Sequence, residues 1–511
     1  MNFRSEHIGA CNVVYLFLKA AEQYPERVAI VAGRREITYG ELRSEVLQTA
    51  AYLRHKGIQS GDRVLVFVPM SINLYRMVLA IFYVGATAVF LDEWVSRKRL
   101  VLCCRMAECK GFIGICKARV YAWFTPVLRR IPVHLSLRGR RRAAIAPAEV
   151  KGSASALITF TTGSTGTPKA ADRSHAFLRA QFGALLDEIQ PTPTDVDMVG
   201  LPIVLFVNLG VGCTSVIPRF QMRRPERNRL SRVVRQLEQH RVTRMTASPF
   251  FVRAVAEELI QQGAGLSHLQ NIFTGGAPVF PDEAEVYERA FPKATCRIVY
   301  GSTEAEPISS ILTKDLLAQR DALTRGLPVG IPYHGTAVRV LSITEPPPHR
   351  CTVAQLEAAT LPPGELGEIA VAGAHVLDRY YRNDEAFYTN KIIADGQLWH
   401  RTGDSGFLHN GQLYLTGRVA QLIQGDDGAW LSPFVVEYRL QQLPSVRMGT
   451  LVEVAGQRVL VVEWEKHHPE ANEIALSAFE YDELKSIPKM PRDPRHHSKI
   501  DYGRLREIIA T

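Results

Sequence analysis

Apolar runs of strand length alternate with helical patterns along much of this chain, and this alternation constrains the fold more than any other feature of the sequence. Residues 63–68 and 88–91 are apolar runs, and a helical pattern from Asn73 to Val84 lies between them. Similar runs return at 111–115, 242–247 and 297–300. Strands that alternate with helices form mostly parallel sheets covered by helices. We therefore predict an α/β fold.

The pattern changes in the last third of the chain. From about residue 326 to Gly417, glycine, proline and short strands dominate, and this predicts a small β-barrel-like part. The segment after Gly417 contains strand candidates at 451–454 and 458–463 and a helical stretch near 474–479. Because 511 residues exceed one typical core, we expect two domains. These are a large N-terminal domain of layered α/β sheets (1–417) and a small mobile α+β C-terminal domain (418–511).

Composition and charge are those of a globular protein, with 46% apolar and 22% charged residues. The net charge of +10 owes much to arginine clusters at 138–142 and 223–229. Such blocks attract acidic carriers, anionic lipid or nucleic acid, but more often they are solvated loops. We favour the solvated interpretation and expect no nucleic-acid partner.

The eight cysteines show no CxxC motif and no histidine at metal-ligand spacing, which indicates reduced thiols. The N-terminus lacks an apolar signal core, and the longest apolar run, 77–91, is too short to span a bilayer. These features predict a cytoplasmic protein with at most peripheral membrane contact.

A loop rich in glycine and hydroxyl groups follows the apolar run 156–160. Its residues are Thr161, Thr162, Gly163, Ser164, Thr165, Gly166, Thr167, Pro168 and Lys169. Glycines let backbone N–H groups approach an anion, and the lysine supplies a mobile positive charge. Pro168 precedes the lysine and no Ser or Thr follows it, so this is not a Walker loop. The pattern favours a polyphosphate site over an ordinary surface connection.

Polar residues also follow later strand-like runs, where α/β sheets bind ligands. Gly275, Gly276 and Ala277 offer bare backbone to a flat ligand. The segment from Tyr300 through Gly301 to Glu304 offers an aromatic ring for a base, hydroxyls for a phosphate and a carboxylate for Mg²⁺. Asp404 has two oxygens that can accept from ribose hydroxyls. Together these residues indicate a nucleotide site.

Several of these motifs stand in the order found in the adenylate-forming superfamily. They are residues 160–169, 300–304, 400–404, 417–418 and 498–501. Over nearly its whole length the chain resembles acyl-CoA synthetases, peptide-synthetase adenylation domains and luciferases. The resemblance implies two half-reactions. A carboxylate attacks the α-phosphorus of ATP and releases pyrophosphate, and a nucleophile then captures the acyl-adenylate.

The resemblance also implies a role for each matching residue. The loop from Thr161 to Gly166 and Lys169 would hold phosphates. Gly275, Gly276, Ala277, Tyr300 and Gly301 would line the nucleotide pocket, Thr303 would touch the α-phosphate, Glu304 would anchor Mg²⁺, and Asp404 and Arg418 would fix the ribose. Lys499 would bridge the carboxylate and ribose oxygens. Because the two anionic reactants repel, a lysine and Mg²⁺ are needed to screen them.

Three positions depart from the family pattern. Ala170 follows the loop lysine where glycine is usual, and Ala420 stands where the family has Asp or Lys. Gly425, Asp426, Asp427 and Gly428 replace a segment that normally supports the thioester-forming conformation. These departures make transfer to CoA less certain.

One branch of the superfamily shares the departing features. Residues 112–118, 201–206, 216–218, 417–420 and 493–500 resemble olefin β-lactone synthetases and related fatty acyl ligases. In the lactone enzymes the substrate's own 3-hydroxyl attacks the adenylate. Phe206 and Asn208 lie in the segment that usually borders the acyl pocket in this family. They either contact substrate or pack in the core.

Three functions remain open from the sequence. The first is a medium- or long-chain fatty acid ligase that passes the acyl group to CoA or an acyl carrier protein. The second is a β-lactone synthetase acting on a 3-hydroxy fatty acid. The third is a non-catalytic nucleotide-binding protein, which the retained charged residues disfavour because an unneeded charged site costs stability.

Overall fold

The computed structural model describes residues 11–91, 97–161, 168–220, 229–443, 445–465, 476, 479–492 and 500–510. Most of the predicted phosphate loop, Thr162 to Thr167, therefore lies outside the described residues. So do Lys499 and most of the predicted helix at 474–479.

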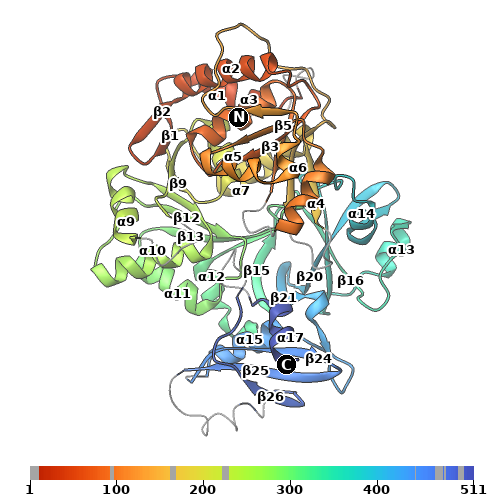
Figure 1. Cartoon of the computed structure of the whole chain (residues 1–511). Coiled ribbons are helices and arrows are strands. Elements are labelled where there is room, and N and C mark those ends of the chain that lie inside the picture. The colour runs from red at the N-terminus through yellow and green to blue at the C-terminus, as the bar shows by residue number, and fades with distance from the viewer. Residues whose placement is uncertain are drawn as a thin grey trace.

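A first sheet in the N-terminal part is parallel except at one edge (Figure 1). Its strand order is β6 (Val133–Leu135), β5 (Gly111–Gly114), β3 (Arg63–Phe67), β4 (Thr87–Phe90), β7 (Ser155–Thr161) and β8 (Lys169–Ser174). Only β7 and β8 pair antiparallel, and they flank the predicted phosphate loop. The register places Thr161 opposite Lys169, so the two ends of that loop lie side by side.

The second sheet is longer and joins a parallel region to an antiparallel one. The parallel region contains β1 (Val28–Ala32), β10 (Thr214–Ile217), β9 (Val196–Val199), β11 (Arg244–Ala247), β12 (Asn271–Gly275) and β13 (Thr295–Tyr300), with β2 (Arg35–Thr38) antiparallel at its edge. The antiparallel region contains β14 (Ser309–Leu312), β15 (Leu327–Pro332), β21 (Gln412–Arg418), β20 (Gln397–His409), β18 (Gly367–Ala372) and β16 (Ala337–Leu341). Short strands β17 (Arg350–Cys351) and β19 (Lys391–Ala394) extend it. The change of pattern predicted near residue 326 is this change from parallel to antiparallel pairing.

Helices cover both sheets, and the sequence explains where several begin. They are α1 (Val14–Gln23), α2 (Tyr39–His55), α3 (Ile72–Tyr83), α4 (Arg97–Ala107), α5 (Cys116–Trp123), α6 (Pro126–Arg129), α7 (His175–Ile189), α8 (Pro202–Val211), α9 (Leu230–Gln239), α10 (Pro249–Gln262), α11 (Pro281–Ala290), α12 (Thr313–Ala318), α13 (Val353–Ala358) and α14 (Asp384–Asn390), with the 3-10 turn η2 (Arg320–Thr324). Thr38 and Glu41 form a capping box at the start of α2. Pro202 begins α8, where its missing N–H costs no helical hydrogen bond.

The predicted helix between the first two apolar runs is α3. It is buried on nearly every side in the main core, which explains why the run 77–91 is so apolar. Within the described residues, no helix is long and apolar enough to cross a bilayer.

The chain after Arg418 forms a separate small sheet (Figure 1, blue). Its strands are β24 (Val446–Val454), β25 (Gln457–Trp464) and β26 (Glu483–Ser486), packed by α15 (Pro433–Gln441) and α17 (Tyr502–Ile509). The turn η3 (Val419–Gln421) and the hairpin β22 (Ile423–Gln424) with β23 (Trp430–Leu431) connect it to β21. Both strands predicted here are present as β24 and β25. The domain boundary at 417–418 and the mobility of the C-terminal domain stay predictions.

Candidate active site

A large cleft runs along the carboxyl ends of β12 and β13 and reaches the small C-terminal sheet. The predicted site residues that line it are Lys169, Phe206, Gly275, Gly276, Ala277, Tyr300, Gly301, Thr303, Glu304, Asp404 and Arg418. They come from both sheets and from α8, and the first and last of them, Lys169 and Arg418, are 249 positions apart in the chain. The fold therefore brings together residues that the sequence suggested one motif at a time.

Tyr300, Asp404 and Arg418 form one polar group at the end of β13. The Tyr300 hydroxyl donates to Asp404 Oδ2 at 2.7 Å, and Arg418 Nη1 lies 3.2 Å from Asp404 Oδ1. The register of β20 with β21 sets Asp404 opposite Arg418. Burial raises the pKa of Tyr300 and the Asp404 carboxylate adds to the rise, so the phenol remains a donor. This group holds a carboxylate in a fixed orientation at the cleft wall.

The backbone after β12 lies too close to β13 for any side chain. A Cβ added to Gly275 would lie 2.3 Å from the Val299 carbonyl oxygen, and Gly276 has φ of +83°. Glycine at these two positions leaves the backbone of residues 275–277 bare at the cleft. Such a surface accommodates a flat ligand.

We expect Gly275→Ala to lower both the melting temperature and the affinity for nucleotide, because the added methyl must push β12 away from β13. The cost should be about 1–3 kcal/mol, as for other overpacked sites. Thermal unfolding and nucleotide titration would measure the two effects. Gly265→Ala is the matched control, since no atom lies within 4 Å of its added Cβ. Equal melting temperatures for the two variants would contradict this account.

The turn after β13 presents Thr303 and Glu304 to the cleft. Arg173, on β8, donates to the Thr303 carbonyl oxygen at 3.1 Å and to Thr159 Oγ1 at 3.1 Å. The Tyr380 hydroxyl donates to Glu304 Oε1 at 3.2 Å. The sequence analysis missed Arg173 and Tyr380. For Arg173 the available signal was the charged pair of Asp172 and Arg173 close behind Lys169 in the chain.

Two cations accompany Glu304. The Lys169 ammonium donates to Asn390 Oδ1 at 2.9 Å. Burial lowers the pKa of Lys169, and the Glu304 carboxylate opposes this shift. Arg173 is buried, and within the described part of the chain its Nε has no hydrogen-bond partner. Positive charge and a buried donor beside the Glu304 carboxylate fit a polyphosphate chelated with Mg²⁺.

A metal ion would need the phosphates as ligands here. No group of three His, Cys, Asp or Glu among the described residues could hold a metal. Mg²⁺ is commonly bound by one or two carboxylates together with substrate phosphates. Glu304 is the residue that would supply the carboxylate, and the ion would neutralise negative charge on the phosphates.

Lys391 is a third residue that the sequence motifs did not indicate. Its side chain is fully buried, and its ammonium donates to the Leu377 carbonyl oxygen and lies 5.7 Å from the centre of the Tyr380 ring. Burial lowers the pKa of Lys391 to about 7, although the Glu304 carboxylate opposes the shift. Near neutral pH this lysine can therefore gain or lose its proton, close enough to Glu304 for the two charges to interact.

The depressed pKa of Lys391 predicts a pH-dependent stability. The unfolded chain binds this proton more tightly than the folded chain does, so stability should rise as pH increases from about 7 towards the unfolded value of 10.5. Lys391→Met lacks this gain. Relative to this variant, the wild-type free energy of unfolding should therefore rise by on the order of a few kcal/mol between about pH 6.5 and 9.5. The difference in melting temperature between the two proteins, measured across this pH range, reports that rise. The exposed Lys489 provides a control variant, Lys489→Met, that should show no such trend. A constant difference between wild type and Lys391→Met would contradict the assignment.

Phe206 and Asn208 lie on the same helix, α8, but in different surroundings. Phe206 lines the cleft, and its ring lies 4.9 Å from the ring of Tyr75. Asn208 is fully buried, and its amide donates to Asp197 Oδ2 at 3.0 Å and to Ser215 Oγ at 3.2 Å. Asn208 therefore packs in the core, which is the second of the two alternatives predicted for it, because residues two apart on a helix face nearly opposite directions.

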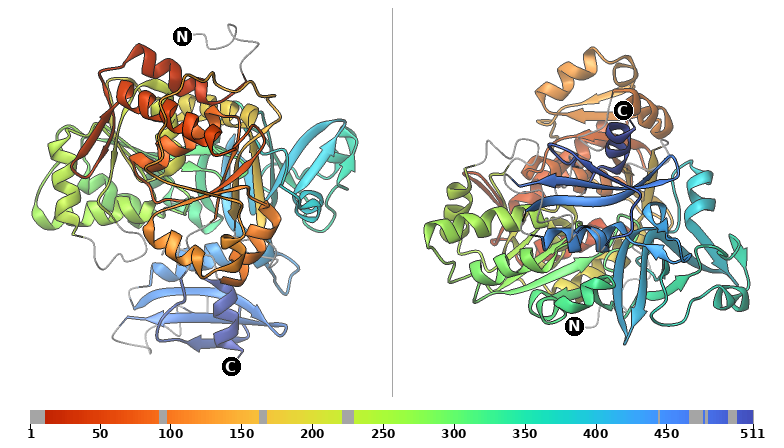
Figure 2. Two further views of the ribbon diagram at one scale, coloured as in Figure 1. Left: turned by 45° about the horizontal axis from the view of Figure 1, so that its top comes forward. Right: turned by 90° about the horizontal axis from the view of Figure 1, so that it is seen from below.

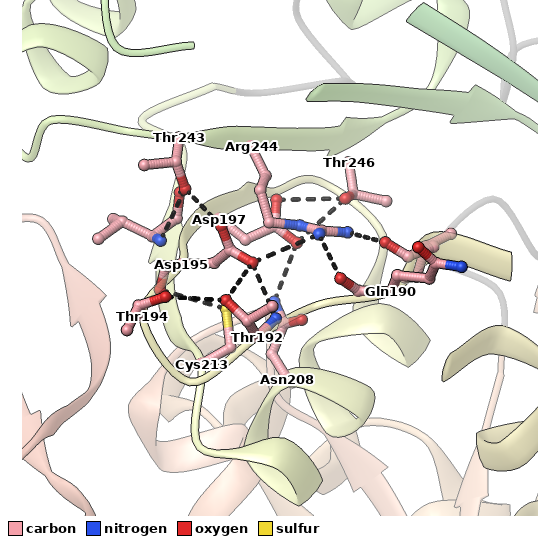
Figure 3. A network of polar contacts seen from close by, with 12 residues as sticks. Gln190, Thr192, Thr194, Asp195, Asp197, Asn208, Cys213, Thr243, Arg244 and Thr246 are labelled. Carbon is pink, nitrogen blue, oxygen red and sulfur yellow. Dashed lines mark hydrogen bonds and ion pairs between the residues drawn. The ribbon is translucent and has the colours of Figure 1, made fainter. Parts of the chain in front are cut away.

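The network around Asn208 ties α8 to the parallel sheet (Figure 3). Asp197 on β9 also accepts from Thr246 Oγ1 at 3.0 Å, and Arg244 Nη1 lies 3.5 Å from Asp195 Oδ2. Burial raises the pKa of Asp197, and Arg244 opposes the rise. These buried hydrogen bonds fix the position of α8 and hence of Phe206.

The departing segment from Gly425 to Gly428 is the turn between β22 and β23. Asp426 accepts from Arg458 at 3.1 Å, and its backbone N–H donates to Glu480 Oε1 at 2.8 Å. Arg458 also pairs with Asp482 at 2.9 Å. This acidic turn is thus held against β25 by one shared arginine.

Comparison with known proteins identifies the family of this site. The AMP-binding enzyme family model matches residues 17–381, which is more than half of the chain. The chain belongs to the AMP-binding enzyme family. Olefin beta-lactone synthetases of Stenotrophomonas maltophilia and of Xanthomonas campestris pv. campestris are each 29% identical to it, over 97% of this chain and 97% of theirs.

Solved structures of AMP-binding enzymes share the fold. The amide bond synthetase McbA from Marinactinospora thermotolerans superposes with a TM-score of 0.80 at 22% identity, covering 97% of this chain and 99% of that one. O-succinylbenzoate coenzyme A synthetase (MenE) from Bacillus subtilis, in complex with AMP, gives 0.78 at 19% identity, covering 96% and 98%. The predicted fold class is confirmed, and the chain is an AMP-forming ligase that activates an acid as its adenylate.

Proposed function

We propose that this ligase activates a medium- or long-chain fatty acid with ATP and releases pyrophosphate. The observation that carries the proposal is the convergence of Lys169, Glu304, Asp404 and Arg418 on a cleft whose wall is extended by Phe206. One acid oxygen attacks the α-phosphorus, the bond to the pyrophosphate oxygen breaks, and an acyl-adenylate remains. Arg173 supports Thr303 near that phosphorus, and Asp404 with Arg418 orients the ribose.

A small apolar cavity of about 50 Å³ lies behind Phe206, and side chains around it would have to move to admit more than the first carbons of an acyl chain. This cavity shares Leu157, Ile203 and Phe206 with the cleft. Its remaining wall is apolar apart from one glutamine: Val13, Leu16, Phe17, Leu79, Phe82, Leu178, Gln181, Phe182, Leu185, Val207 and Leu209. Burying methylene groups there would contribute about 0.8 kcal/mol each, which favours a fatty acid over a small polar one.

Enlarging Phe206 should therefore shorten the acid that the enzyme accepts. We expect Phe206→Trp to lower pyrophosphate release with a long-chain acid by about tenfold while sparing a short-chain acid, in line with the 1–3 kcal/mol cost of overpacking. Pyrophosphate release across a series of chain lengths measures this. Tyr388→Trp, at an exposed position on α14, is the control. A uniform loss over all chain lengths would show that Phe206 does not border the acyl chain.

For the second step we favour intramolecular closure over thioester formation. The 3-hydroxyl oxygen of the substrate would attack the acyl carbon, lose its proton and expel AMP, which closes a four-membered lactone. Two observations support this choice: two relatives that match over 97% of both chains are olefin beta-lactone synthetases, and an acidic hairpin stands at Gly425 to Gly428. CoA or an acyl carrier protein is the acceptor in the competing proposal.

Product analysis by mass spectrometry tests both steps. The chain is incubated with ATP and Mg²⁺ and with a plain or a 3-hydroxy fatty acid, each with and without CoA. A lactone formed only from the 3-hydroxy acid and independent of CoA supports closure. If a thioester forms and its formation requires CoA, the second step is the ligase reaction and not lactone closure. If pyrophosphate is released with none of the acids, the proposed activation itself is overturned.

A further inference from the structure

The structure exposes a cluster of large hydrophobic side chains on one pair of helices. Among the described residues nine large hydrophobic side chains are exposed, and five of them come from α4, α5 and the C-cap residue of α5. Val120, Tyr121, Trp123 and Phe124 are 60%, 43%, 69% and 73% exposed. The last five residues of α5, apart from Ala122, present their side chains to solvent, and so does the C-cap residue Phe124. We name these four residues, with the cations of α5 and α6, the α5–α6 surface.

The same part of the chain has a large local excess of positive charge. Residues 97–130 contain nine Lys or Arg and one acidic residue, whereas the whole chain has a net charge of +10. The single acid, Glu108, pairs with Arg382 at 2.6 Å. Exposed cations flank the hydrophobic cluster on both sides: Lys117, Arg119, Arg129 and Arg130. The local field of this surface is therefore strongly positive.

The α5–α6 surface borders the candidate active site. Lys117, Ala118 and Tyr121 line the cleft, so one side of α5 faces the cleft while Trp123 and Phe124 are open to solvent. Figure 2 shows the orange helices of this region projecting from the edge of the N-terminal part. A ligand held at this surface would be next to the opening of the cleft.

Aromatic side chains surrounded by cations match the chemistry of a membrane interface. Trp and other amphipathic rings partition to the headgroup region, and Lys or Arg are attracted to anionic lipid. An acidic protein would use the cations but would leave four apolar side chains without a role. We propose that the α5–α6 surface docks on an anionic lipid bilayer. A fatty acid would then pass from that bilayer into the cleft, and this last step rests on the proposed function.

Vesicle co-sedimentation of the full chain tests the docking independently of catalysis. We expect binding to phosphatidylcholine vesicles that contain about 30% phosphatidylglycerol, weak binding to phosphatidylcholine alone, and a decrease with added salt. Trp123→Ala/Phe124→Ala should lower binding at least about tenfold, and Arg129→Glu/Arg130→Glu should do the same. Controls are Tyr388→Ala for exposed aromatic area and Arg141→Glu/Arg142→Glu for exposed charge elsewhere, and both should bind like wild type.

Each result decides the proposal. Unchanged binding by Trp123→Ala/Phe124→Ala, or no binding by wild type to anionic vesicles, would overturn it. Binding to an acidic polypeptide such as polyglutamate, but not to vesicles, would assign the surface to a protein partner instead. Pyrophosphate release with a dissolved fatty acid is measured in parallel on the same variants. If the wild-type protein releases no pyrophosphate, the proposed function is rejected, but the conclusion from vesicle binding still holds.

Discussion

Lys499→Ala should lower pyrophosphate release by about 100- to 1,000-fold, the usual effect of removing one group that stabilises developing charge in a transition state. Two anions meet in this reaction, and the resemblance to adenylate-forming enzymes assigns Lys499 to bridge them. The residue lies outside the described residues, so this role rests on its sequence motif. ATP affinity should change little, because Lys169, Asp404 and Arg418 remain.

The measurement pairs a pyrophosphate assay with nucleotide titration of the same preparation. Lys489→Ala is the matched control, because it removes an exposed lysine from the same C-terminal part without touching the motif. Pyrophosphate release by Lys499→Ala at the wild-type rate would exclude the lysine from the mechanism. An equal loss in both lysine variants would point to charge or folding of the C-terminal part rather than to chemistry.

The strands, and the carboxyl ends of the strands where ligands bind, could be predicted from the local pattern of apolar and polar residues. The runs at 63–68 and 297–300 are β3 and β13, and Tyr300 stands at the end of β13 as expected. This success has a simple cause. In a parallel sheet the carboxyl ends lie at one edge, so a polar residue after each run already indicates a common site.

The contacts that support the site could not be predicted in the same way. Tyr380 reaches Glu304 across 76 positions, and Lys169 reaches Asn390 across 221. No periodicity within either segment specifies such a pairing. Asn208 shows why proximity in the sequence does not decide between a pocket and the core: it stands two residues from Phe206, yet the helical rotation between them places it in the core.

Asp404→Asn should raise the KM for ATP by about 10- to 100-fold, since a hydrogen bond to a charged group is worth about 1.5–3 kcal/mol. The substitution keeps the shape of the side chain but removes its charge and one of its acceptors. Tyr300 can still donate to the remaining oxygen. Arg418 then loses its anionic partner, and a ribose hydroxyl has no second carboxylate oxygen to bond.

The surface of the same protein offers a close control. Asp187 Oδ2 accepts from the Tyr333 hydroxyl at 2.8 Å, much as Asp404 accepts from Tyr300, but its side chain is 55% exposed and does not line the cleft. Asp187→Asn should leave the ATP KM unchanged. Steady-state kinetics at saturating acid compare the two variants. If Asp187→Asn raises the KM as much as Asp404→Asn does, the effect comes from general electrostatics rather than from ribose binding, because only Asp404 lies within the cleft.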